Sequence, residues 1–435
     1  MLPGFIEPHT HLSLSSILGM FGQLQAPPIG NVTTTAGIVD VMKAWVKDNN
    51  EFITKVGWIV GCAYDERAYE GHQHPTREQL DQVSTDVPVF ALQLSLHSGV
   101  VNSKGLQLLG IDEKFVNPPD GAAGRKPNST IPSGLIEESI FFKAFLGMLQ
   151  KIPYDMLSHA FEVTEQRYIA SGFTTITDGR TDPMSLMALV KYADQKRLKL
   201  DVVAYIDFLV FSPNNLYKRW TNYTNKYNYT NQLRIGGGKL VVDGSIQAST
   251  AWLKEPYYHI PEGQAADYKG YGTYKTTQQL ADLMTTLRKN DMQINVHANG
   301  DAGIQQFIEA VEQSRKDYNV PTTVPPTGKF NFTNLDNERV VCLHCQYTTE
   351  DLTQRMKLNH IIPSYFSAHI IFWGDWHRTQ TLGPERAKRL SVAGEAHKNK
   401  MLFTAHLDSP VAPPQVMYII SSLVNRKCPS GVVLG

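Results

Sequence analysis

The chain has 435 residues, of which 42% are hydrophobic and 19% charged, so it can bury a large core and lacks the composition of a disordered protein. Its 41 basic and 41 acidic residues give a net charge of +0, which offers no attraction to nucleic acid or to an anionic membrane. No apolar run is long enough to cross a membrane as a helix, and four cysteines in so long a chain do not make a disulfide framework.

The first half of the chain predicts a mixture of helices and short strands. A short apolar strand over 3–12 is followed by a mixed loop over 12–28. Further strands are expected over 58–63, 88–97, 172–178 and 198–211, and helices over 39–56, 75–83, 101–109, 136–149, 156–170 and 183–196. The segment 117–133 is rich in Gly, Pro, Asn and Ser and predicts a long surface loop, and 214–231 is a polar insertion.

From Leu233 onward, strands and helices alternate regularly. Strands are expected over 234–242, 293–297, 339–344, 361–366 and 401–408, and helices over 276–289, 302–314, 350–358 and 384–396. This alternation predicts a parallel sheet with helices outside, and about eight such units favour a (β/α)₈ barrel. A doubly wound open sheet is the second choice, but no Gly-x-Gly-x-x-Gly or P-loop follows any strand. We expect one barrel domain over 1–435, with loop insertions around 60–150 and 212–232.

Two histidines stand one residue apart at the end of the first strand. Residues i and i+2 of a strand point to the same face, so His9 and His11 can aim both imidazoles at one divalent cation. Taken alone, the pair is slightly better explained as two polar side chains at a strand end.

Other side chains that can bind a metal follow the later strands. His297, His344 and Asp408 stand at strand ends, where barrel enzymes keep their chemistry, although each could also be an ordinary hydrogen-bonded residue or turn former. Lys239 lies inside an apolar strand, where a lysine is costly unless it is paired or modified. Reaction of its amine with CO₂ would give a carbamate able to bridge two cations; the alternative is a lysine that points into solvent.

The cysteines and the glycosylation sequons give weaker signals. Cys342-Leu-His-Cys345 has the spacing of a redox or zinc pair, but with no second pair we expect both cysteines to be buried in a strand. Five N-glycosylation sequons mildly favour a secreted protein; they begin at Asn31, Asn128, Asn222, Asn228 and Asn331. No signal peptide precedes the first strand, so both a cytoplasmic and a secreted location stay open.

The order His-X-His, Lys, His, His, Asp resembles that of the amidohydrolase superfamily, and nearly the whole chain is similar to its amidohydrolase-3 (YtcJ-like) family. The motifs that carry the resemblance are 3–12, 88–103, 172–178, 239–245, 296–301, 343–346 and 406–411. The run from Ser367 through His369 to Trp373-Gly-Asp375 most resembles the N-substituted formamide deformylase-like subgroup. Relatives usually extend further at both ends, and these flanks form a small β-sandwich that we expect to be largely missing here.

The resemblance also implies a set of roles. One or two divalent ions, with zinc expected, would be held by His9, His11 and Asp408 on one side and by His297 and His344 on the other, with carbamylated Lys239 as the bridge. Asp408 would take a proton from the activated water and pass it to the leaving nitrogen. His97 would help to polarise the substrate carbonyl, or is merely a hydrogen-bonded strand-end residue. His369 and Trp373 would line the substrate pocket, or pack a long loop.

We therefore expect an enzyme that hydrolyses a non-peptide C–N bond in a small carboxamide or N-substituted formamide. A cyclic-amidine deaminase or an esterase on the same site is an alternative reaction. An alternative of another class is a truncated, inactive relative that only binds metal or ligand. No nucleic-acid or membrane partner is expected, and a homodimer stays open.

Overall fold

Two β-sheets organise the chain, one in each of two units. The first unit comprises Met1–Ser13 with Glu165–Gly435, and the second comprises Leu14–Thr164. This computed structural model describes the chain except for residues 1, 28, 70, 119, 214, 226, 262–263 and 319–337. In the described part of the chain, no helix is long and apolar enough to span a membrane.

The sheet of the first unit has eight strands, and every pairing in it is parallel. In spatial order the strands are β1 (Phe5–Glu7), β8 (Phe173–Thr181), β9 (Asp201–Asp207), β10 (Leu233–Val241), β11 (Gln293–Ala298), β12 (Val341–His344), β13 (Ile362–Tyr365) and β14 (Thr404–Ala405). Beyond the two outer strands, backbone hydrogen bonds from Asp408 to His9 (3.2 Å) and from His11 to Ser409 (3.0 Å) bring the two edges together. The predicted (β/α)₈ barrel is confirmed.

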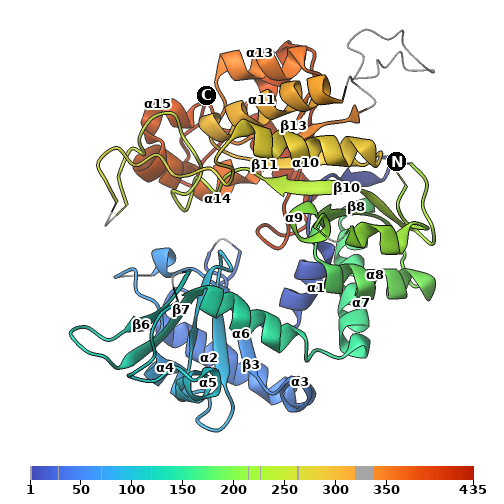
Figure 1. Cartoon of the computed structure of the whole chain (residues 1–435). Helices are drawn as coiled ribbons and strands as arrows, with labels where there is room; N and C mark the ends of the chain where they lie inside the picture. Colours follow the sequence, from blue (N-terminus) through green and yellow to red (C-terminus); the bar gives the residue numbers. More distant parts are fainter. Residues whose placement is uncertain are drawn as a thin grey trace. The chain divides into compact units, whose positions relative to one another are not determined.

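Helices follow most of these strands (Figure 1). They are α8 (Pro183–Asp194), α9 (Phe208–Phe211), α10 (Thr277–Lys289), α11 (Asp301–Asp317), α13 (Glu350–Leu358), α14 (Ala368–Trp376), α15 (Gly383–Ala387), α16 (Ala393–Lys398) and α17 (Val416–Asn425), with short turns η2 (Leu216–Trp220) and η3 (His377–Thr381). Thr276 and Gln279 begin α10 with a capping box, and its apolar side chains Leu280, Met284 and Leu287 are fully buried.

Glycines let α10 and β11 approach β10 closely. A Cβ at Gly237 would lie 2.2 Å from the carbonyl oxygen of Gln293, and one at Gly238 would lie 2.5 Å from Leu287. No side chain fits at these distances, so the Gly236-Gly237-Gly238 run fixes the register and the packing of β10, the strand that carries Lys239.

A buried ion cluster ties α10 and α11 to the segment before β12. Glu338 accepts from Nε of Arg288 and from Nε of Arg315, both at 2.8 Å. The side chains of the two arginines are only 5% and 6% exposed. A second nitrogen of each is also bonded, Arg288 to Ser314 and Arg315 to Asn359. These two arginines are structural, because both are buried and bonded within the protein.

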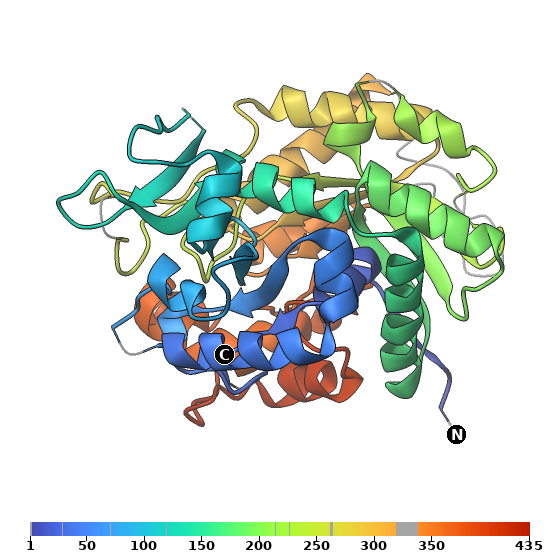
Figure 2. The same cartoon turned by 90° about the horizontal axis from the view of Figure 1, so that it is seen from below.

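The second unit runs from blue to teal in Figures 1 and 2 and has its own six-stranded mixed sheet. In spatial order the strands are β2 (Gly22–Gln23), β3 (Ile59–Tyr64), β4 (Val89–Gln93), β5 (Ser98–Val101), β7 (Pro132–Glu138) and β6 (Gly121–Arg125). Its helices are α2 (Thr35–Asp48), α3 (Asn50–Val56), α4 (Arg77–Asp81), α5 (Ser103–Leu109) and α6 (Ser139–Leu149), with the turn η1 (Glu66–Ala68). Helices α1 (Leu12–Gly19) and α7 (Tyr154–Ala170) contain the two points at which the chain passes between the units.

Several predicted elements differ from the structure. The expected loop over 117–133 contains β6 and the start of β7, because antiparallel pairing uses backbone groups that small residues also possess. The expected loop over 12–28 begins with α1, in which Ser13 and Ser16 are buried rather than free to form turns. The expected helices over 39–56 and 384–396 are each two helices, and the last strand is only β14. The strand predicted over 198–211 ends at Asp207, and the helix predicted over 136–149 starts only at Ser139.

The predicted domain organisation stays a prediction, and its insertion around 60–150 falls within the second unit. All four cysteines are free and buried, as expected for Cys342 and Cys345. The sequons at Asn31, Asn128, Asn222 and Asn228 are exposed, and Asn331 lies outside the described residues.

Candidate metal centre

The side chains predicted to bind metal gather at the carboxyl ends of the barrel strands. His9 and His11 follow β1, and Lys239, His297 and His344 lie on β10, β11 and β12. Asp408 follows β14. Because parallel strands end on the same side of a barrel, these six residues meet in one place although they are spread over four hundred positions of the sequence.

Asp408 lies at the middle of this group. Its Oδ1 is 3.1 Å from Nε2 of His11 and 3.4 Å from Nε2 of His9, and its Oδ2 is 3.7 Å from Nδ1 of His344. Oδ1 is buried, yet it makes no hydrogen bond with any residue that the structure describes. Ligand atoms of His9, His344 and Asp408 all lie within 4.8 Å of one another, as a shared cation requires.

Two neighbours hold His9 in place. The backbone nitrogens of His9 and Leu407 both lie 3.3 Å from Oε1 of buried Glu7, which thereby joins the segments that carry His9 and Asp408. On the other side, a Cβ at Gly179 of β8 would lie 2.3 Å from the His9 ring. Only glycine allows the strand to pass the imidazole this closely.

Lys239 and His297 complete the group on its far side. Nζ of Lys239 is 3.3 Å from Nε2 of His9. Nε2 of His297 is 3.0 Å from the carbonyl oxygen of Gly244, and the ring centroid of His297 is 4.4 Å from that of His344. Nε2 of His297 also lies 3.0 Å from the amide nitrogen of Asn299, so a carbonyl acceptor and an amide donor both adjoin it.

His406 is a member of the cluster that the sequence analysis did not single out. It is fully buried, with Nε2 at 3.1 Å from Nδ1 of His344 and Nδ1 at 2.9 Å from Oγ of Ser364. The signal was available, because His406 stands two positions before Asp408, the same spacing that singled out His9 and His11.

Burial sets the ionisation of these groups. It lowers the pKa of His9 and His344 well below the usual value and lowers that of His297 and His406 to about 3. At neutral pH these imidazoles are therefore uncharged and keep a lone pair for a cation.

The lysine and the carboxylate are shifted as well. Burial lowers the pKa of Lys239 to about 7. Burial would raise the pKa of Asp408, but His11, His406 and Lys239 outweigh that effect and lower it to about 2, so Asp408 is ionised. Neutral imidazoles around an ionised carboxylate are a donor set that fits a divalent metal such as zinc.

The remaining predicted residues lie elsewhere. His369 is buried on α14, with its ring 4.6 Å from Phe366 and 4.7 Å from Trp373, and its Nδ1 is 3.2 Å from Nε2 of His377. Phe366 in turn stacks on His406, so ring contacts connect His369 to the cluster. His97 belongs to the second unit, where its exposed side chain lies 3.1 Å from Glu138.

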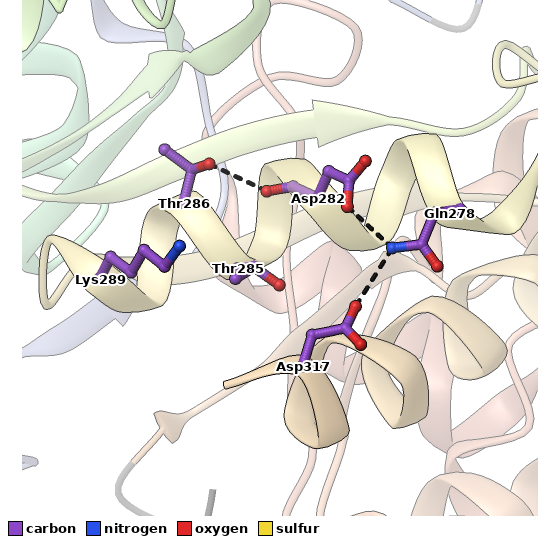
Figure 3. A pocket seen from close by; sticks show the side chains of 6 residues that line it. All are labelled: Gln278, Asp282, Thr285, Thr286, Lys289 and Asp317. Carbon is purple, nitrogen blue, oxygen red and sulfur yellow. Dashed lines mark hydrogen bonds between the residues drawn. The ribbon is translucent and has the colours of Figure 1, made fainter. Parts of the chain in front are cut away.

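A hollow on the outside of the barrel lies between α10 and α11 (Figure 3). It is lined by Gln278, Asp282, Thr285, Thr286, Lys289 and Asp317. Gln278 donates to Asp282 (2.8 Å) and to Asp317 (3.1 Å), so its amide already joins the two carboxylates. No histidine or cysteine lines this hollow, and none of the predicted site residues does.

Comparisons with known proteins show relatives in sequence and in fold. The model of a family described as "Amidohydrolase family" matches residues 1–435. The putative amidohydrolase YtcJ of Bacillus subtilis is 23% identical over 98% of this chain and 73% of its own length. The N-substituted formamide deformylase of Arthrobacter pascens is 23% identical over 74% of this chain and 58% of its own. In fold, the chain resembles an uncharacterised metal-dependent hydrolase from Pyrococcus horikoshii with a TM-score of 0.73 at 20% identity, covering 99% of this chain and 76% of that one.

Proposed function

The chain belongs to the amidohydrolase family, and on that premise we propose that it hydrolyses a non-peptide C–N bond in a carboxamide or N-substituted formamide. The observation that carries this proposal is the buried Oδ1 of Asp408, which makes no hydrogen bond among the described residues although two imidazole nitrogens lie within 3.4 Å of it. A bound cation would give this oxygen and the neighbouring lone pairs their missing partner.

The proposed ligands divide into two groups around zinc. His9, His11 and Asp408 would hold one ion, and His297 and His344 would hold a second. Lys239 would bridge them as a carbamate, formed when its uncharged amine attacks CO₂ and loses a proton. The low pKa of Lys239, about 7, supports this step because much of the amine is uncharged at neutral pH.

The metal, when bound, supplies a Lewis acid that polarises a carbonyl and lowers the pKa of water. The residues of the chain then move the protons. Ionised Asp408 takes one proton from the attacking water and delivers it to the leaving nitrogen, so that the C–N bond breaks as the C–O bond forms. The products are a carboxylic acid, or formate, and a free amine.

Three further residues have proposed roles. His369 and Trp373 would line the pocket for the small-molecule substrate, in keeping with the ring contacts that join His369 to the cluster through Phe366. For His97 we keep the hypothesis that it helps to polarise the substrate carbonyl; its hydrogen bond to Glu138 supports a purely structural role equally well.

The proposal is tested by a hydrolysis screen on zinc-loaded protein with N-formyl amines, N-acyl amino acids, cyclic amidines and lactones, with metal content measured on the same samples. We expect one to two zinc ions per chain, by the ligand count, and amine release from an amide or a formamide. Turnover of only the amidines or the lactones would replace the proposed reaction by deamination or ester hydrolysis. Absence of bound metal would refute the site itself.

A further inference from the structure

Arg180 lies beside the proposed metal site and has no part in the reaction described so far. It follows Gly179, whose backbone passes directly against the His9 ring and donates a hydrogen bond to the carbonyl of Thr10 (2.6 Å). Arg180 is thus one residue away from a contact with a proposed ligand, near the carboxyl end of β8.

Asp207 places the guanidinium on the same side of the barrel as Lys239. Nε of Arg180 donates to Oδ2 of Asp207 at 2.8 Å. Asp207 is the last residue of β9 and stands directly beside Lys239 in the register of β9 and β10. Paired residues of neighbouring parallel strands point to the same face, so Asp207, and with it the head of Arg180, lies next to Lys239. Because Lys239 is a proposed ligand, the guanidinium lies close to the place where a substrate on the metal would bind.

Most hydrogen-bond donors of Arg180 remain available. Arginine has five N–H donors, and only Nε of Arg180 has a partner among the described residues. Its side chain is 53% exposed, while that of Asp207 is 11% exposed. The structural arginines of this chain differ, because Arg288 and Arg315 are buried and both bond through a second nitrogen as well as through Nε. A guanidinium held at Nε with both terminal nitrogens free is prepared to bind a second anion.

We propose that Arg180 binds a carboxylate of the substrate, and that the enzyme acts on amides carrying a free carboxylate group, such as N-acyl amino acids or half-amides of dicarboxylic acids. This inference rests on the proposed amide hydrolysis at the same site. Asp207 holds the guanidinium through Nε, and the two terminal nitrogens supply the parallel pair of donors that fits a carboxylate.

Kinetics on matched substrates test the proposal. N-acetylglycine and succinamic acid carry a carboxylate on the amine side and on the acyl side, and N-acetylglycinamide and succinamide are their uncharged partners. We expect R180Q to lower kcat/KM for at least one of the two acids by about 10- to 100-fold, the range for hydrogen bonds to a charged group, and to change the uncharged amides by less than about threefold. R180K should retain part of the preference, because it keeps the charge and loses the fork. R219Q, at an exposed arginine in η2, is the control and should behave as wild type.

A binding measurement separates this inference from the proposed reaction. Succinate and butyrate have the same carbon chain and differ by one carboxylate, and calorimetry on zinc-loaded protein measures both. Wild type should bind succinate more tightly by about tenfold or more, and R180Q should lose that preference. Should this pattern appear while no amide is hydrolysed, the anion site stands and the proposed reaction falls. An unchanged succinate preference in R180Q, or equal losses on acids and uncharged amides, would overturn the role of Arg180.

Discussion

Gly179→Ala is a small substitution that should disturb the proposed metal site without replacing any of the proposed ligands. The added Cβ would lie 2.3 Å from Cε1 and 2.4 Å from Nδ1 of His9, and 2.9 Å from the carbonyl oxygen of Thr10. Ordinary contact begins near 3.4 Å, so the ring would have to retreat by about 1 Å. It has no room to do so, because His9 is 1% exposed and its centroid lies 5.0–5.2 Å from those of His11, His344 and His406.

The magnitude follows from these contacts. Overpacking of a filled site costs roughly 1–3 kcal/mol, which should lower the free energy of unfolding of the metal-free protein by that amount. If His9 binds the metal as proposed, a displaced ring should also weaken zinc binding by about 10- to 100-fold, the effect seen when support for a ligand is lost. Denaturant melts of the metal-free protein and zinc competition against a chromophoric chelator measure the two effects separately.

A matched control is available in the same unit. A Cβ at Gly394 in α16 would meet nothing within 4 Å, so Gly394→Ala should leave zinc affinity unchanged and stabilise the helix by up to ~1 kcal/mol. Zinc affinity within twofold of wild type in Gly179→Ala, with an unchanged melt, would show that His9 does not need its observed position to bind metal.

Three further results are expected. Asp408→Asn should keep the fold but lower kcat/KM by ~10²–10⁴-fold, because an amide cannot accept the proton. The control His72→Ala, outside every motif, should keep a kcat/KM near that of wild type. A loss under about tenfold in Asp408→Asn with metal retained would assign the proton transfer to another residue. Lys239→Ala should lower the zinc content by one ion per chain in elemental analysis, and an unchanged content would remove Lys239 from the site. Glu338→Gln should destabilise the protein by ~3–5 kcal/mol in denaturant melts at pH 7, because it leaves buried arginine charges uncompensated. Burial opposes the ionisation of Glu338, but Arg288 and Arg315 outweigh it and lower the pKa of Glu338. The stability that Glu338 contributes is therefore fully present above the unfolded-state pKa of ~4.3 and is lost as the pH falls through the lower folded-state pKa. The unfolding free energies of wild type and Glu338→Gln should converge in acid, and a constant difference down to pH ~2 would contradict this reasoning.

The barrel, and the gathering of the candidate ligands at one end of it, could be predicted because both depend on local order in the sequence. Alternating strands and helices predict the parallel sheet, and strand ends predict where His297 and His344 lie. His406 was missed although its spacing from Asp408 was visible. The support that Gly179 gives to His9 could not have been predicted, because it depends on contacts between separate strands. The positive backbone φ angles of His344 (68°) and Asp408 (55°) could not have been predicted either, since only a few per cent of non-glycine residues adopt them.

The second unit eluded prediction for a related reason. Its pattern of short strands and helices resembles further barrel units, and only pairing shows that β3 and β4 belong to another sheet. The hairpin of β6 and β7 was hidden by glycine and alanine, which carry little strand propensity and are held by partner strands instead.

The interleaving of the two units has a consequence for biosynthesis. Thr10 and Ser409 are hydrogen-bonded although 399 positions separate them. The proposed ligands His9 and His11 are the sequence neighbours of Thr10, and Asp408 is the neighbour of Ser409. At a translation rate of ~5–20 residues per second, the ribosome needs roughly 20–80 seconds after making His9 before Asp408 exists. Meanwhile β1 has no barrel neighbour, since β8 follows only after the whole second unit. A nascent chain therefore carries His9 and His11 without Asp408 during that interval, and the proposed metal site can be completed only after Asp408 is made.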